Sequence, residues 1–126
     1  MRGVIEIERV NTILYCRRWP ETVAFYRDSL GLSVEYSNDW FVEFAVGSGA
    51  FVSVADAART SIPAGDGAGI TMSWRVADVA AVRSALLDMG VDIGDVRTRW
   101  GADAVDVHDP AGNRIEFWSD APQRDA

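Results

Sequence analysis

The fold of this chain is decided by the stretch His108-Asp109-Pro110-Ala111-Gly112-Asn113-Arg114-Ile115-Glu116-Phe117-Trp118. Asp-Pro followed by Gly-Asn is typical of a tight turn, because proline presets φ and glycine tolerates φ above zero. Apolar and polar residues alternate on both sides of this turn. The pattern predicts a hairpin whose second strand places Glu116 and Trp118 on the face opposite Ile115 and Phe117.

The chain around this hairpin has the composition of one globular domain. It has 126 residues, of which 48% are hydrophobic and 25% charged, and a chain of this length buries about two-thirds of its unfolded surface. The net charge of -7 disfavours a nucleic-acid partner. The single cysteine, Cys16, suits a reducing compartment. The sequence shows neither a signal peptide nor an apolar run of about 20 residues, so we expect a soluble cytoplasmic protein without a membrane partner.

The same order of elements is predicted twice along the chain. In the first half we expect extended chain over 4–16, a helix from Pro20 that ends at Gly31, and strands over 32–36, 40–46 and 50–55. In the second half we expect a strand over 71–76, a helix over 79–89 that ends at Gly90, extended chain over 91–96, a strand over 100–107, and the strand that follows the Asp-Pro turn. An offset of about sixty residues places Asn11 on Thr71 and Ser53 on Glu116.

This repetition predicts an α+β fold made of two tandem βαβββ modules. We expect one module over about 4–56, a linker over 57–69, the second module over 70–119 and a flexible tail over 120–126. The helices would cover the outer face of a curved mixed sheet, which leaves its other face as a concave cleft.

Two motifs resemble the vicinal oxygen chelate superfamily, which includes glyoxalase I, extradiol dioxygenases, and the fosfomycin- and bleomycin-resistance proteins. The first is Phe25-Tyr26 followed by Leu30-Gly31. The second is Asp109-Pro110-Ala111-Gly112-Asn113 followed by Ile115-Glu116. The resemblance runs from about Val10 to Ser119. It implies the duplicated fold and says little about the chemistry.

The resemblance also implies where a metal would bind. Enzymes of this superfamily hold a divalent metal with His or Gln and Glu side chains from four strands, and the matching positions are Asn11, Ser53, Thr71 and Glu116. Only Glu116 is a usual ligand, since metals at such sites prefer nitrogen or anionic oxygen. We therefore predict no metal and no cofactor. The only histidine, His108, precedes the tight turn and is predicted to be a turn residue.

Strand alternation predicts which side chains line the cleft. The predicted ligand-binding residues are Asn11, Ile13, Tyr15, Trp40, Phe51, Ser53, Thr71, Arg75, Trp100, Glu116 and Trp118. Aromatic walls with a few polar groups are typical of a small-molecule pocket.

Several of these residues have two interpretations at this stage. Trp40 and Trp100 begin equivalent predicted strands, and they either flank the mouth of the cleft or cover the ends of the sheet. Glu116 either contacts the ligand or forms an ion pair with Arg75. Trp74 is expected on the side that packs against the helix.

The leading functional hypothesis follows from the resemblance to metal-free proteins of the bleomycin-resistance kind. These bind a bulky ligand in a cleft shared between two subunits. We expect a homodimer that sequesters a hydrophobic or aromatic small molecule, such as an antibiotic or another natural product. The alternative is a glyoxalase- or dioxygenase-like enzyme, a lyase or isomerase, that depends on a metal or uses Glu116 as general acid or base. A third possibility is an interaction module whose cleft is closed by its own side chains.

Overall fold

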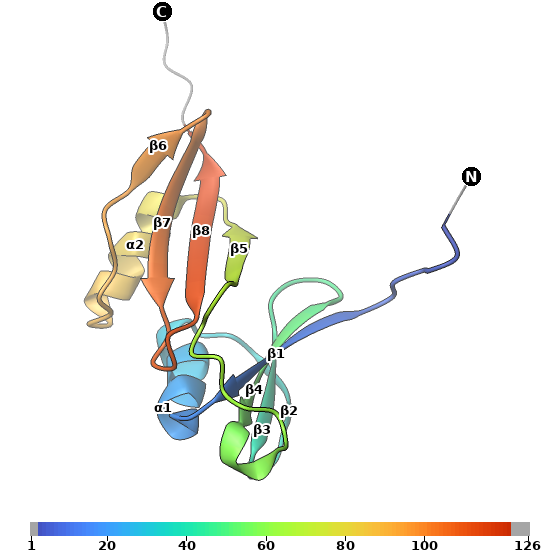
Figure 1. Ribbon diagram of the computed structural model, residues 1–126. Coiled ribbons are helices and arrows are strands. Elements are labelled where there is room, and N and C mark those ends of the chain that lie inside the picture. Colours follow the sequence, from blue (N-terminus) through green and yellow to red (C-terminus); the bar gives the residue numbers. More distant parts are fainter. Residues whose placement is uncertain (1–2, 122–126) are drawn as a thin grey trace, which may run out of the picture. The chain divides into compact units, whose positions relative to one another are not determined.

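The computed structural model describes residues 3–121, and the chain divides after Gly65 into two compact units. Within these residues, each unit contains a four-stranded mixed sheet and one α-helix (Figure 1). The α+β class and the repeated βαβββ order are therefore confirmed. No helix in this part of the chain is long and apolar enough to cross a membrane.

The first unit contains a four-stranded sheet with β1 at one edge. Its elements are β1 (Val10–Cys16), α1 (Trp19–Ala24), the π-helical turn η1 (Phe25–Ser29), β2 (Val34–Ser37), β3 (Phe41–Ala45), β4 (Ala50–Asp56) and the 3₁₀ helix η2 (Ala57–Arg59). The strand order is β1-β4-β3-β2, with β1 parallel to β4. Leu14 and Cys16 are buried. Trp19 Nε1 donates a hydrogen bond of 2.9 Å to the carbonyl of Val54 and so ties the helix start to β4.

The second unit repeats this arrangement. Its elements are β5 (Thr71–Arg75), α2 (Val79–Asp88), β6 (Arg97–Arg99), β7 (Ala102–His108) and β8 (Arg114–Asp120). The strand order is β5-β8-β7-β6, with β5 parallel to β8. Val105, Val107, Ile115 and Phe117 are buried, and Trp74 packs edge-on against Phe117 with ring centroids 5.9 Å apart. Trp74 thus lies on the core side of the sheet, as predicted.

The turn that decides the fold is held by one carboxylate. Asp109 is buried, and its Oδ1 accepts hydrogen bonds of 2.9 Å from the backbone N–H groups of Ala111 and Asn113. Its Oδ2 accepts a third bond, of 2.8 Å, from the Asn113 side chain. Gly112 has φ of +94°, a value that a residue with a Cβ rarely adopts. The turn connects β7 to β8, which confirms the predicted hairpin.

The structure adds a short strand, β6, after the extended stretch 91–96 and starts the next strand later than predicted. In the stretch 91–96, only Ile93 forms a bridge, to Val107, and the pairing strand is β6. Trp100, predicted to start a strand, lies with Gly101 in the two-residue turn between β6 and β7. Both residues have positive φ, +51° and +75°, which the right-handed twist of a two-residue hairpin favours.

Both ends of the described chain also differ from the expected boundaries. Residues 4–9 belong to no strand. Strand β8 includes Asp120, where the flexible tail was predicted to begin. Positions 122–126 of that predicted tail lie outside the described residues.

Candidate ligand-binding site

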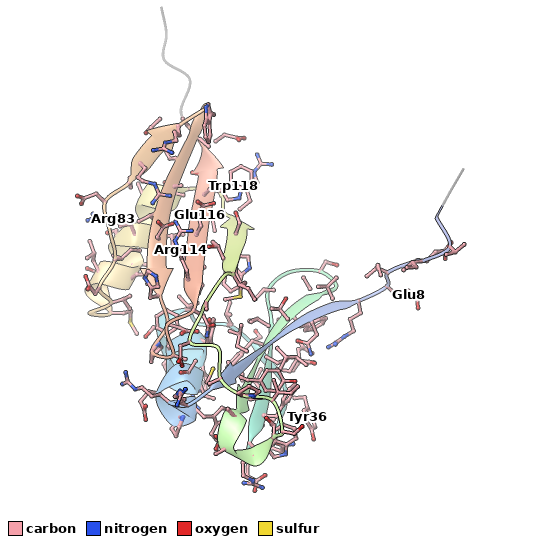
Figure 2. The ribbon with its side chains drawn as sticks, in the orientation of Figure 1. Glu8, Tyr36, Arg83, Arg114, Glu116 and Trp118 are labelled. Atoms are coloured by element: carbon pink, nitrogen blue, oxygen red, sulfur yellow. The ribbon has the colours of Figure 1, made fainter. Side chains whose placement is uncertain are left out.

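The side of the second sheet opposite its buried core carries polar and aromatic side chains. We call this surface the open face of the second unit; its members are Thr71, Ser73, Arg75, Arg97, Arg99, Ala102, Ala104, Asp106, Arg114, Glu116 and Trp118. The strand register aligns them in rows across the sheet, and Glu116 lies between Ser73 on β5 and Asp106 on β7. Figure 2 shows Arg114, Glu116 and Trp118 following one another along β8. Strand alternation alone explains this arrangement.

A pocket of about 350 Å³ opens on this face. It is lined by Ser73, Arg97, Arg99, Trp100, Ala102, Ala104, Glu116 and Trp118. The two tryptophans supply aromatic surface, and the two alanines leave room between them because their side chains are short. The volume is at the lower end of the range for small-molecule sites. Three predicted ligand-binding residues, Trp100, Glu116 and Trp118, thus line one pocket.

The carboxylate in the pocket is held by its neighbours. Ser73 Oγ donates a hydrogen bond of 3.0 Å to Glu116 Oε1, and Arg97 Nη2 lies 3.4 Å from Glu116 Oε2. The alternative pairing of Glu116 with Arg75 is wrong. Arg75 lies opposite Trp118 in the register and forms its ion pair with Asp120, while its guanidinium lies 5.3 Å from the Trp118 ring centroid.

Next to Glu116, two arginines converge on Asp106. Arg97 forms a short ion pair with Asp106, and Arg114 donates to Asp106 at 2.6 Å and to the Thr71 hydroxyl at 2.9 Å. Burial alone would raise the pKa of the Asp106 carboxyl, but hydrogen bonds from Arg97 and Arg114 outweigh it and hold the pKa below its ordinary value. The same hydrogen bond raises the pKa of Arg97, against the opposing effect of desolvation.

The equivalent surface of the first unit carries a network of contacts among its own side chains. We call it the open face of the first unit; its members are Asn11, Ile13, Tyr15, Glu43, Phe51 and Ser53. Ser53 is buried, and its hydroxyl donates a hydrogen bond of 2.7 Å to Asn11 Oδ1. The Asn11 side-chain amide donates a hydrogen bond of 3.3 Å to Glu43. Arg9 completes the chain of contacts: it pairs with Glu43, and its guanidinium lies 3.6 Å from the centroid of the Phe51 ring.

The remaining predicted residues are not among those that line this pocket. Ile13 and Tyr15 share the open face of the first unit, where Ile13 is 39% exposed. Trp40 precedes β3 and packs edge-on against Phe41 with ring centroids 5.5 Å apart. Thr71 and Arg75 are on the open face of the second unit but do not line the pocket. Their roles in binding remain predictions.

Four charged residues of these networks were not predicted: Arg9, Glu43, Arg97 and Asp106. One signal was available for the two acids. An offset of 63 residues relates Ser53 to Glu116 (116 − 53) and also Glu43 to Asp106 (106 − 43). The internal repeat therefore places an acid opposite the last strand of each module. Their arginine partners come from different elements in the two units, so no repeat predicts them.

The four positions that the resemblance assigns to a metal do not suit one. Asn11 Oδ1 accepts from Ser53, and the Thr71 hydroxyl accepts from Arg114. Both Glu116 oxygens have donors in Ser73 and Arg97. Three neutral oxygens and one carboxylate beside an arginine are poor ligands for a transition metal. Among residues 3–121, no group of three or more His, Cys, Asp and Glu side chains is arranged to hold a metal ion.

Comparisons with known proteins agree with this architecture. The Glyoxalase/Bleomycin resistance protein/Dioxygenase superfamily has a sequence model that matches residues 7–117. A search of curated proteins finds no match. Similar solved structures include a lactoylglutathione lyase from Agrobacterium tumefaciens, with 20% identity over 87% of this chain and 91% of that chain and a TM-score of 0.71.

Two further structures are similar over almost the whole chain. TnmS3, an antibiotic binding protein from Streptomyces sp. CB03234, has 16% identity over 96% of this chain and all of that chain (100%), with a TM-score of 0.76. A glyoxalase/bleomycin resistance protein/dioxygenase from Nocardioides has 17% identity over 100% of this chain and 93% of that chain, also with a TM-score of 0.76. At such low identity these similarities show the fold alone.

Proposed function

We propose that this chain, which belongs to the Glyoxalase/Bleomycin resistance protein/Dioxygenase superfamily, binds a hydrophobic or aromatic small molecule and withholds it from its target without using a metal. The observation that carries the proposal is the pocket of about 350 Å³ that Trp100 and Trp118 line together. An antibiotic or another natural product with planar rings has the surface that such walls contact. Protection of that target would then be stoichiometric, because each site holds one ligand molecule.

The pocket has the chemistry that binding requires. Aromatic stacking contributes about 0.5–1.5 kcal/mol per pair beyond the area it buries, and Trp100 is 93% exposed, so its ring surface is available to a ligand. Ser73 and Glu116 supply the few polar groups that orient a bound molecule. The fold occurs both in an antibiotic binding protein and in a lyase, so the fold does not choose between binding and catalysis.

We also propose that the protein is a cytoplasmic homodimer. The only thiol, that of Cys16, is on a fully buried residue, as suits a structural cysteine.

Before β1, Val4, Ile5 and Ile7 are 100%, 76% and 69% exposed, and such apolar side chains are suited to contact with a second copy. Light scattering coupled to size-exclusion chromatography tests this; a monomer mass at micromolar concentration would contradict the dimer.

A fluorescence titration tests the binding proposal. Planar aromatic compounds are added to the protein with and without EDTA, and intrinsic tryptophan emission is followed. We expect saturable quenching that EDTA leaves unchanged, with the compound recovered intact by mass spectrometry. Conversion of the compound, or binding that EDTA abolishes, would instead support the enzymatic alternative. Absence of quenching across the series would contradict the proposal.

A further inference from the structure

We propose that the pocket of the second unit selects aromatic ligands that carry an anionic group, and that Arg99 recognises the charge. This inference rests on the proposed function, because it concerns the same pocket. The carboxylate is the simplest such group.

Three charged residues line the pocket, and two of them are already paired. Arg97 contacts both Asp106 and Glu116, and Glu116 also accepts from Ser73. Within residues 3–121, Arg99 forms no ion pair with a carboxylate; its contact is with the Trp100 ring, whose centroid lies 5.7 Å from the guanidinium carbon. The pocket therefore presents one uncompensated positive charge beside an aromatic wall.

The turn next to Arg99 fixes where that charge lies. Arg99 pairs with Ala102 across the two-residue turn, and the short Ala102 side chain leaves the space in front of it open. Trp100 holds φ of +51°, a conformation that costs a non-glycine residue steric energy. Its ring is almost fully exposed, so packing within the chain does not offset that cost. The two-residue turn accounts for the positive φ, and a ligand contact would account for the aromatic ring left exposed at the pocket rim.

A guanidinium in this position suits a planar acid. Its fork of N–H donors matches the two oxygens of a carboxylate, and its plane can lie on an aromatic ring at the same time. A ligand with its ring against Trp100 or Trp118 would bring an attached carboxylate toward Arg99. The net charge of -7 does not prevent this, since exposed charges beyond about 8 Å are screened at physiological salt.

A matched set of probes tests the proposal. We would titrate 2-naphthoate, its neutral isostere 2-naphthamide and 2-naphthylmethylammonium against the wild-type chain, Arg99→Gln and Arg83→Gln. Arg83→Gln is the control because it removes the same charge from the same unit. Arg83 lies on α2, where it contacts Gly94 and Asp95 (Figure 2). Isothermal titration calorimetry gives the affinities, and circular dichroism confirms that both variants fold.

We expect the wild-type chain to prefer naphthoate over naphthamide by about tenfold. Arg99→Gln should abolish that preference and leave the affinity for the amide within about twofold of the wild-type value. Arg83→Gln should keep the wild-type preference. Equal weakening of both ligands by Arg99→Gln, or a wild-type preference for the amide or the cation, would overturn the inference while leaving the proposed function standing. Failure of all three probes to bind the folded wild-type chain would contradict both.

Discussion

The open faces of the two units place an acid at the same register position and use it differently. In the first unit, Glu43 lies opposite Ser53 and takes part in a chain of hydrogen bonds that Arg9 closes over Phe51. In the second, Asp106 lies opposite Glu116 at the edge of a pocket. The backbone pattern is the same in both, so the difference between the two faces comes from their side chains.

If the proposed function holds, the two units of the repeated scaffold have separate tasks. In the first unit, Ser53, Asn11, Glu43 and Arg9 form a continuous chain of hydrogen bonds, and a satisfied network of this kind favours stability. In the second, the aromatic side chains stay uncovered while the charged groups between them are held in place. Substitutions on each face test this division.

Truncating an aromatic wall should affect binding most. In Trp118→Ala, loss of the ring should weaken the affinity for an aromatic ligand by about thirtyfold, or about 2 kcal/mol. Tyr36→Leu is the matched control, because Tyr36 is an exposed aromatic residue on β2 of the first unit. Calorimetric titration of both variants measures the difference. Equal losses would mean that the pocket of the second unit is not the binding site.

Removing the acid shared by two arginines should affect stability. In Asp106→Asn, Arg97 and Arg114 lose their common anionic partner, whose side chain is only 20% exposed. We expect a loss of about 1–2 kcal/mol in the free energy of unfolding, measured by urea denaturation. Asp95→Asn, at a position 99% exposed, should change it by less than about 0.5 kcal/mol. Equal values for the two variants would argue against a structural role for the cluster.

The same acid predicts a dependence of stability on pH. The pKa of Asp106 is lowered in the folded state. The contribution of this carboxylate to folding stability is therefore fully present above its ordinary pKa of 3.8, and it is lost as the pH falls through the lowered pKa. We expect the wild-type chain to lose about 1 kcal/mol more than Asp106→Asn on acidification from pH 5 to about pH 3. Parallel stability curves for the two proteins would contradict the assignment.

The hydroxyl groups on the two faces offer the finest test. Ser53→Ala removes a buried donor to Asn11 and should cost about 1 kcal/mol of stability without changing ligand affinity. Ser73→Ala removes the donor to Glu116 from a more exposed position and should cost less than about 0.5 kcal/mol. Ser73→Ala should instead weaken the affinity for an aromatic ligand by about twofold. Reversal of this pattern would mean that the roles of the two faces are exchanged.

Local sequence signals account for most of the fold. The Asp109 turn, the glycine that ends each helix and the alternation along β8 each depend on residues close together in sequence. They correctly place Trp118 and Glu116 on the side of the sheet away from the buried Ile115 and Phe117. Such signals are predictive because each depends on the φ preference or the side-chain direction of a single residue.

The site itself was less predictable, because it depends on register. A hairpin turn only two residues long sets which residues of β6 lie opposite β7, and thereby brings Arg97 close enough to pair with Asp106. Trp100 has no intrinsic preference for positive φ, so nothing local placed it in that turn. The pairing of Arg75 with Asp120 in place of Glu116 likewise follows from the strand register.

The two-residue turn at Trp100-Gly101 is a position where ligand preference should change without loss of folding stability. No residue of this tip belongs to the buried core, so substitutions at Arg99 and Trp100 should alter ligand choice at little cost to folding, provided that Gly101 keeps its positive φ. If the proposed function holds, diversifying those two positions in a library should yield chains that share one scaffold and bind different molecules. The hairpin tip is thus a natural starting point for retargeting this protein by directed evolution.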